Sequence, residues 1–302
     1  MSESSPIFKQ TTLAHDVSII GTGLHSGAEV TLVLKPAEAD QGILFVRSDM
    51  PAGTNEIPAL WDRVVDTRLC TVIANSSGAS VGTIEHLMAA LRGLNIDNLT
   101  IEVNAPEVPI LDGSSQPFID AIEPVGVTNL EVPRRTIKVL KPVMVSDGDK
   151  LVQLSPASIP QFSGEIDFDH PLIGRQSYDM TLANGDFSHH LADCRTFGFE
   201  RDVEAMRAAG LARGGSLDNA IVLSDTGVLN PTGLRHKDEF IRHKLLDAVG
   251  DLYLAGAQIE GNYHGVKPGH EMNNKLLHAL FADSSAWAFE PPHSEKKTAD
   301  LI

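Results

Sequence analysis

The chain has 302 residues, and its 24 Lys and Arg against 40 Asp and Glu give a formal net charge of -16 at pH 7. A field of that sign repels nucleic acid and anionic membrane surfaces, so neither is an expected partner. The N-terminus lacks the basic and apolar regions of a secretion signal, and no apolar run approaches the roughly 18 residues of a membrane-spanning helix. We therefore expect a cytoplasmic protein with no stable membrane insertion.

Cys70 and Cys194 are the only cysteines, and they lie far apart in the sequence. Such a pair suggests neither a disulfide framework nor a thiolate zinc site. If the protein holds a metal ion, we expect histidine and carboxylate ligands.

The first part of the chain alternates β-rich runs with one helical stretch, and a second short helix is expected around 119–122. The β-rich runs are TTLAHDVSII (11–20), EVTLVLKP (29–36), GILFVRS (42–48), RLCTVIAN (68–75) and NLTIEVNA (98–105), and the helical stretch is TIEHLMAALRGL (83–94).

The second part repeats this pattern after the charged turn VPRR at 132–135. We expect strands in TIKVLKPVMV (136–145), LVQLSP (151–156), GEIDFDH (164–170), AIVLS (220–224) and AQIEG (257–261), a mixed segment over 196–215, and helices over 239–256 and 270–282. The polar residues from Ser294 to Ile302 are expected to form a loose tail.

A helix followed by a strand occurs in both parts, so the sequence predicts an α+β protein made of two similar halves. In each half, helices should pack on mostly antiparallel sheets. We place the N-terminal domain at residues 1–131 and the C-terminal domain at residues 132–302.

A polar stripe interrupts the apolar face of the helix expected over 239–256. His243, Asp247 and Asp251 follow one another at a spacing of four, which is about one helical turn. His243 and Asp247 could simply form a hydrogen-bonded pair. They could equally bind one zinc ion, because their side chains reach the same point beside the helix. A catalytic zinc would then need a third ligand from elsewhere.

Glu85 and His86 open the helical stretch of the first part. Glu85 could be an ordinary first-turn carboxylate favoured by the helix dipole, with His86 a core histidine. Alternatively, His86 is the third zinc ligand and Glu85 the base that accepts a proton from water. Both side chains can border one site only near the helix start, where the backbone turns after Gly82 and Thr83.

His270 opens the helix expected over 270–282, after a Pro-Gly turn. It could merely begin the helix, or it could protonate a leaving group or stabilise an oxyanion as an imidazolium. A carboxylate partner would raise its pKa toward that role, and Asp251 is a candidate.

Nine segments together resemble the UDP-3-O-acyl-N-acetylglucosamine deacetylase family, the zinc amidases of lipid A biosynthesis in Gram-negative bacteria. They follow the family's order from about residue 9 to 280. The segments are GTGLHSG (21–27), RVVDTRLCT (63–71), GTIEHLMAALRGLNIDN (82–98), APEVPILDGSS (105–115), IDFDHP (166–171), RTFGFERDVE (195–204), GGSLDNAIV (214–222), EFIRHKLLDAVGDL (239–252) and GHEMNNKLL (269–277).

The resemblance implies two two-layer α/β halves that face each other across the active site, in a metal-dependent amide hydrolase. A monomer is the simplest expectation, because nothing in the sequence resembles a dimerisation element. It implies one zinc ion per chain, with iron(II) as an alternative in the cell, and an acylated UDP-N-acetylglucosamine as substrate. The implied metal ligands are His86, His243 and Asp247, the implied catalytic residues are Glu85, His270, Asp251 and Thr196, and the implied substrate contacts are Lys244, Phe197, Val203 and Lys267.

The segment 201–215 resembles the family's apolar passage for the acyl chain. Val203, Met206 and Leu211 are apolar, as that role requires, but their sizes do not fix a chain length. The run GNYHGVKPGH (261–270) departs from the family's more aromatic pattern while it keeps Lys267. A zinc hydrolase of another amide, and a nucleotide-sugar binding protein without activity, stay open as alternatives.

Overall fold

The computed structural model describes residues 8–183 and 185–290, and the tail predicted from Ser294 to Ile302 lies outside them. Within that range, no helix combines the length and the apolar character needed to cross a membrane.

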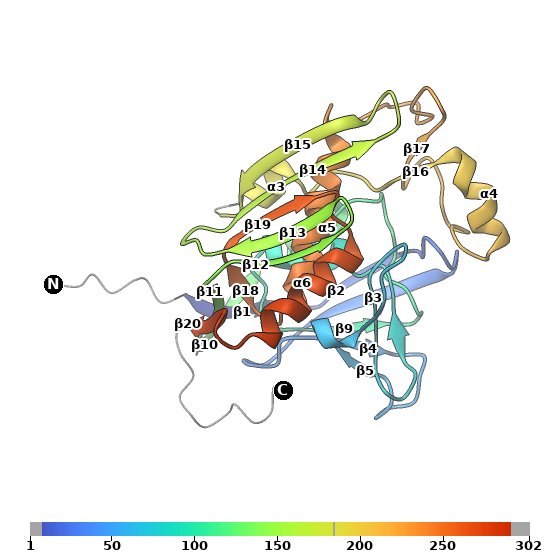
Figure 1. The fold of residues 1–302 in the computed structure, drawn as a ribbon. Helices are drawn as coiled ribbons and strands as arrows, with labels where there is room; N and C mark the ends of the chain where they lie inside the picture. The colour runs from blue at the N-terminus through green and yellow to red at the C-terminus, as the bar shows by residue number, and fades with distance from the viewer. Residues whose placement is uncertain (1–7, 184, 291–302) are drawn as a thin grey trace.

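Two five-stranded sheets of the same topology form the framework (Figure 1). In each sheet, one parallel pair joins strands that are otherwise antiparallel: β4 with β9 in the first and β14 with β19 in the second. The first sheet has the order Val17–Thr22 (β2), Glu29–Pro36 (β3), Leu99–Val103 (β9), Ile43–Arg47 (β4), Glu56–Pro58 (β5), and the second Val143–Asp147 (β12), Lys150–Ser155 (β13), Asn262–Val266 (β19), Gln161–Phe168 (β14), Gly174–Thr181 (β15). The predicted α+β class with mostly antiparallel sheets is confirmed.

Smaller sheets complete the strand pairing. Two of them are pairs: Lys9–Leu13 (β1) with Val127–Pro133 (β10), and Phe197–Phe199 (β16) with Ile221–Leu223 (β17). In a three-stranded sheet, Thr136–Val139 (β11) lies between Gln258–Glu260 (β18) and Trp287–Glu290 (β20). Another three-stranded sheet has the order Val64–Asp66 (β6), Val72–Ala74 (β7), Ser80–Val81 (β8). The domain boundary predicted after residue 131 falls within β10. That division, and the facing of the two halves, stay predictions.

Three strand predictions were wrong in extent. Of the run 68–75, only Val72–Ala74 (β7) forms a strand. The run 136–145 divides into β11 and β12, which belong to different sheets, and Pro142 lies between them. Proline has no backbone N–H for a strand ladder, so it favours the break. The run 11–20 likewise divides into β1 and β2, because the intervening residues 14–16 are exposed and turn the chain from one sheet to another.

The predicted helices are confirmed. The helices are Glu85–Gly93 (α1), Gln116–Ile122 (α2), Asp186–His190 (α3), Glu200–Ala208 (α4), Glu239–Tyr253 (α5) and His270–Ala282 (α6), with a 3-10 turn at Trp61–Arg63. α5 contacts β14 and β15, α6 contacts β12 and β13, and α1 packs along α5. Figure 1 shows α4 projecting at the right of the view, away from the large sheets.

Gly250 sets the distance between α1 and α5. A Cβ atom built on Gly250 would lie 2.0 Å from the carbonyl oxygen of Glu85 and 3.1 Å from the backbone nitrogen of Ala89. Only a residue without a side chain permits this backbone contact. Glycine inside a helix costs about 1 kcal/mol relative to alanine, so the close approach must more than offset that cost.

We therefore expect Gly250→Ala to destabilise the protein, although alanine is the better helix former. The inserted methyl group must push α1 away from α5, at a cost of about 1 to 3 kcal/mol. Urea unfolding followed by circular dichroism measures the change. As a matched control, Ala205→Gly at an exposed position of α4 should cost about 1 kcal/mol through helix propensity alone. A more stable Gly250→Ala variant would contradict the packing argument.

Candidate active site

Three buried side chains from α1 and α5 converge on one point. Asp247 Oδ1 lies 3.3 Å from His243 Nε2 and 3.6 Å from His86 Nε2. The three ligand atoms all lie within 4.8 Å of one another. The sequence spacing predicted that His243 and Asp247 share a helical face, and the packing of α1 on α5 brings His86 to the same place.

This set has the chemistry of a metal centre. Two donors on one tetrahedral zinc ion lie about 3.3 Å apart, given bonds of about 2.0 Å. Asp247 Oδ1 is buried and has no hydrogen-bond partner among the described residues, which is costly unless a cation meets it. His243 Nδ1 lies 3.1 Å from the carbonyl oxygen of Cys194, so that N–H can donate there and leave Nε2 free to bind a metal.

Two members of the set, His243 and Asp247, have pKa values that favour metal binding. Burial lowers the pKa of His243 to about 3, so the imidazole is neutral. Burial raises the pKa of Asp247, but the positive surroundings, with the Lys244 ammonium adjacent, bring it well below its ordinary value. A neutral imidazole and an ionised carboxylate are the forms that bind zinc.

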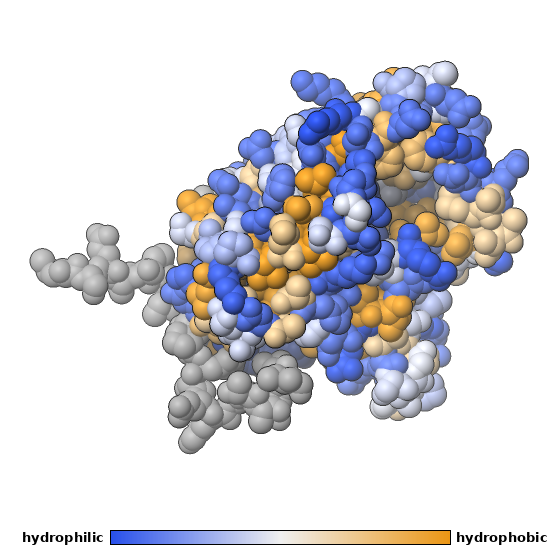
Figure 2. All heavy atoms as spheres, viewed as in Figure 1, coloured by the Kyte–Doolittle hydropathy of each residue, from blue (hydrophilic) through white to orange (hydrophobic). Residues whose placement is uncertain are grey.

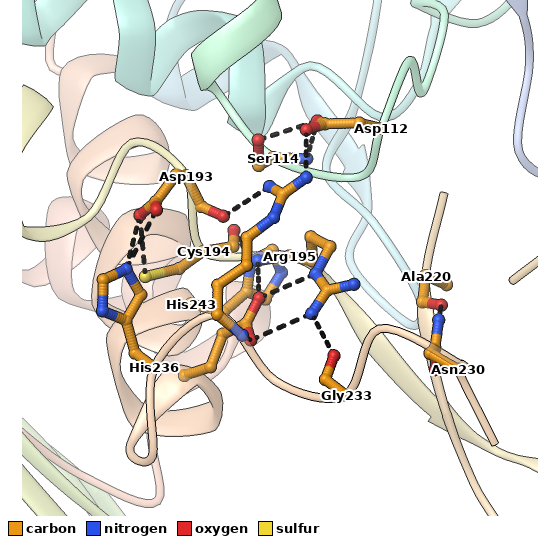
Figure 3. Close-up of polar contacts among 12 residues, drawn as sticks. Asp112, Ser114, Asp193, Cys194, Arg195, Ala220, Asn230, Gly233, His236 and His243 are labelled. Atoms are coloured by element: carbon orange, nitrogen blue, oxygen red, sulfur yellow. Dashed lines mark hydrogen bonds and ion pairs between the residues drawn. The ribbon is translucent and has the colours of Figure 1, made fainter. Parts of the chain in front are cut away.

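A second cluster, Asp193, Cys194 and His236, fits a metal less well (Figure 3). His236 Nε2 already lies 2.8 and 3.0 Å from the two oxygens of Asp193, and Cys194 Sγ lies 3.8 Å from one of them. Burial raises the pKa of the Cys194 thiol, which opposes the thiolate that a metal requires. The polar groups of this cluster thus find hydrogen-bond partners within it, whereas Asp247 Oδ1 has none among the described residues.

Glu85 lies beside the ligand set at the start of α1. Its Oε2 accepts a hydrogen bond from the backbone N–H of Thr71 at 3.0 Å, and its Oε1 lies 3.9 Å from His270 Nε2. Burial raises the pKa of Glu85 above its ordinary value. Thr83, two residues before it, has a φ of +55°, so the chain does turn sharply where the sequence analysis required it to turn.

His270 and Asp251 form a hydrogen-bonded pair, with His270 Nδ1 2.9 Å from Asp251 Oδ2. Burial lowers the pKa of His270, but the charges of Asp251 and Glu85 raise it more, to about 9. The imidazole is therefore protonated at neutral pH. The pairing proposed from the sequence thus exists in the structure.

The other predicted residues lie at different distances from this centre. Lys244 Nζ donates to Asp247 Oδ2 at 2.7 Å and lies 5.6 Å from the centroid of the Phe197 ring. Thr196 precedes Phe197 and is half-buried. Lys267, by contrast, pairs with Asp149 at the surface, and Val203 lies half-buried on α4. The structure therefore groups Lys244 and Phe197 with the ligand set, and places Lys267 in a surface ion pair.

Arg195 and Glu239 form a buried ion pair that the sequence analysis missed. Arg195 Nε lies 2.9 Å from Glu239 Oε1, and its Nη2 donates to the carbonyl oxygen of Gly233 at 2.8 Å (Figure 3). The pair fastens the segment before β16 to the start of α5. Because Cys194 in that segment accepts the His243 hydrogen bond, the pair also steadies the His243 side chain. No local sequence pattern joins residues so far apart.

A cavity of about 490 Å³ lies next to the site. Its mostly apolar walls come from residues 25 and 26, 66, 68 to 70, 72, 82 and 83, 106 and 107, and 210 and 211. Leu211 thus confirms that the segment 201–215 borders an apolar cavity, while Val203 and Met206 are not among its walls. Figure 2 shows apolar surface around a hollow beside α4.

His25 is a cavity residue that the sequence analysis did not single out. Both of its ring nitrogens are buried and find no hydrogen-bond partner among the described residues. Burial lowers its pKa, against the opposing effect of Glu107. Glu107 itself accepts hydrogen bonds from the backbone N–H groups of His25 and Ser26 and from the Thr83 hydroxyl. The cavity therefore contains a neutral imidazole with free hydrogen-bonding capacity.

Comparison with known proteins shows a family that matches most of the chain. The sequence profile described as UDP-3-O-acyl N-acetylglycosamine deacetylase matches residues 10–282. A UDP-3-O-acyl-N-acetylglucosamine deacetylase of Myxococcus xanthus (strain DK1622) is 49% identical over 284 residues, which cover 94% of this chain and 90% of the relative. Proteins of the same name from Haemophilus influenzae (strain 86-028NP) and Phenylobacterium zucineum (strain HLK1) are 46% and 47% identical, over 94% and 92% of this chain and 93% and 95% of their own length.

These findings place the chain among the hydrolases that act on amide bonds, and the paired helices bring together buried side chains that could hold a metal ion. The chain belongs to the UDP-3-O-acyl N-acetylglycosamine deacetylase family.

The His270 pair makes stability depend on pH in a predictable direction. The pKa of His270 is raised from 6.5 to about 9 in the folded protein, so its contribution is complete below pH 6.5 and disappears as the pH rises through about 9. The contribution is at most about 3 kcal/mol. In chelated protein, the unfolding free energies of wild type and His270→Gln should converge across that range, as measured by urea titration at several pH values. His189→Gln, at an exposed position, should stay parallel to wild type; parallel curves for His270→Gln would contradict the assignment.

Proposed function

We propose that the protein removes the acetyl group from UDP-3-O-[(3R)-3-hydroxyacyl]-N-acetylglucosamine, releasing acetate and the free sugar amine, which is the committed step of lipid A biosynthesis. The observation that carries this proposal is the convergence of His86, His243 and Asp247 beside two proton-handling groups, Glu85 and His270. Metal binding alone requires neither of the latter. The family membership supports the substrate class.

We propose His86, His243 and Asp247 as the ligands of one zinc ion. A zinc ion held there would supply a Lewis acid that polarises the amide carbonyl and makes water more acidic. Iron(II) accepts the same imidazole and carboxylate donors, so the metal used in the cell is a separate question.

Glu85 is the proposed general base. Its carboxylate lies beside the ligand set, and its raised pKa suits a group that takes a proton from attacking water near neutral pH. Thr71 fixes one of its oxygens, which leaves the other facing His270 at 3.9 Å. Water adds to the amide carbon as Glu85 takes its proton.

His270 is the proposed general acid. Its imidazolium places positive charge near the oxygen that becomes negative as water adds, and the Thr196 hydroxyl can donate to the same oxygen. Collapse of the tetrahedral species breaks the carbon–nitrogen bond, and the departing amine receives a proton from His270. Asp251 holds the imidazole in place and keeps it charged until that proton is transferred.

The apolar cavity is the proposed site of the acyl chain. Leu69 and Leu211 line it, and His25 offers ring nitrogens to a hydroxyl group on the chain. We assign Lys244 and Phe197 to the sugar side of the site, with Val203 and Lys267 as more distant substrate contacts. A cytoplasmic location and a monomeric state complete the proposal.

Acetate release is the direct test. Purified protein should release acetate from UDP-3-O-(3-hydroxyacyl)-N-acetylglucosamine, lose that activity on chelation, and regain it when zinc returns at no more than one equivalent, because the ligand set holds one ion. Enzymatic assay of acetate measures each stage. Absence of acetate with metal still bound would favour a nucleotide-sugar binding protein, and release from other amides at equal rates would indicate a less specific zinc hydrolase.

The variant Glu85→Gln distinguishes a role in proton transfer from a role in metal binding. We expect kcat to fall by about 10²-fold to 10⁴-fold, because the amide cannot accept the proton, while one metal ion per chain is retained. Steady-state kinetics and metal analysis of the same samples measure both quantities. Glu102→Gln removes a carboxylate that pairs with Lys35 in the first sheet, away from the site, and should keep full activity. Wild-type turnover in Glu85→Gln would rule out the base assignment.

A further inference from the structure

Asp251 is held by three side-chain donors. Its Oδ2 accepts hydrogen bonds from His270 Nδ1 and Asn273 Nδ2, each at 2.9 Å, and its Oδ1 accepts one from Thr71 Oγ1 at 2.6 Å. Asn273 is in turn fixed by the Tyr263 hydroxyl, which donates to its Oδ1 at 2.7 Å. The carboxylate is 3% exposed, so water cannot readily replace a lost donor.

Thr71 is the residue that touches both proton-handling units. Its hydroxyl donates to Asp251, the partner of His270, while its backbone N–H donates to Glu85 Oε2 at 3.0 Å. Thr71 is 2% exposed and lies just after Leu69 and Cys70, which face the cavity. It therefore connects the base, the acid and the cavity wall without lining the cavity itself.

We propose that Thr71 is a positioning residue for catalysis, whose hydroxyl orients Asp251 and whose backbone N–H orients Glu85, so that the base and the imidazole keep their relative places. The kinetic part of this proposal rests on the proposed function. Without the hydroxyl, Asp251 Oδ1 loses its donor and the carboxylate can rotate about its side-chain bonds. Rotation moves the acceptor of His270 Nδ1, and with it the imidazole that faces Glu85.

The test compares Thr71→Val, which keeps the side-chain shape but removes the hydroxyl, with Thr71→Ser, which keeps the hydroxyl. We expect Thr71→Val to lower kcat about 10-fold to 100-fold, with KM and bound metal unchanged, as for the loss of a supporting hydrogen bond around a metal site. Thr71→Ser should recover most of the activity. Thr12→Val removes a buried hydroxyl of β1 and should behave as wild type.

A second readout does not require turnover. In zinc-loaded protein labelled with ¹⁵N-histidine, the ring signals of His270, assigned with His270→Gln, should shift in Thr71→Val and return in Thr71→Ser. Thr71→Ala replaces Thr71→Val if the latter does not fold by circular dichroism. Unchanged His270 signals would overturn the proposal, as would unchanged kcat. If wild type releases no acetate, the proposed function fails, and the His270 signals still decide the role of Thr71.

Discussion

The close contact of α1 with α5 at Gly250 is the constraint on which the site depends. Because the helix backbones touch there, the first turn of α1 reaches the middle of α5, and Glu85 and His86 come to lie beside Asp247 and Asp251. A wider helix spacing would separate His86 from His243 and Asp247. The missing side chain at Gly250 thus lets the polar groups of α1 and α5 lie close together.

The polar side chains of the site are largely buried, and burial alone would favour the neutral form of each. Instead they are arranged so that each charge meets an opposite one: Lys244 beside Asp247, and His270 beside Asp251 and Glu85. His243 is the exception, because burial keeps it neutral and its Nδ1–H can donate to a backbone carbonyl. The same environment therefore yields a neutral imidazole at His243 and a charged imidazole at His270, a short distance apart.

Local patterns in the sequence predicted what depends on local spacing. The apolar periodicity located α1, α5 and α6, and the four-residue interval of His243 and Asp247 placed these two side chains on one helical face. The contacts of Thr71 with Asp251, 180 residues away, and of Arg195 with Glu239 have no such signal, since they arise from tertiary packing. The same holds for the division of the run 136–145 between two sheets, where only strand pairing shows that β11 and β12 have different neighbours.

The shared topology of the two large sheets has a consequence for how the protein could be divided. Although the two sheets repeat one strand order, the helices contribute unequally to the site: α1 carries Glu85 and His86, whereas α5 and α6 carry His243, Asp247, Asp251 and His270. The two sheets thus repeat a strand order, but the polar residues of the site are not repeated with it. His86 lies on α1, whereas His243 and Asp247 lie on α5. If the chain were cut into two complementary fragments between these helices, tight metal binding would therefore indicate that the fragments had assembled.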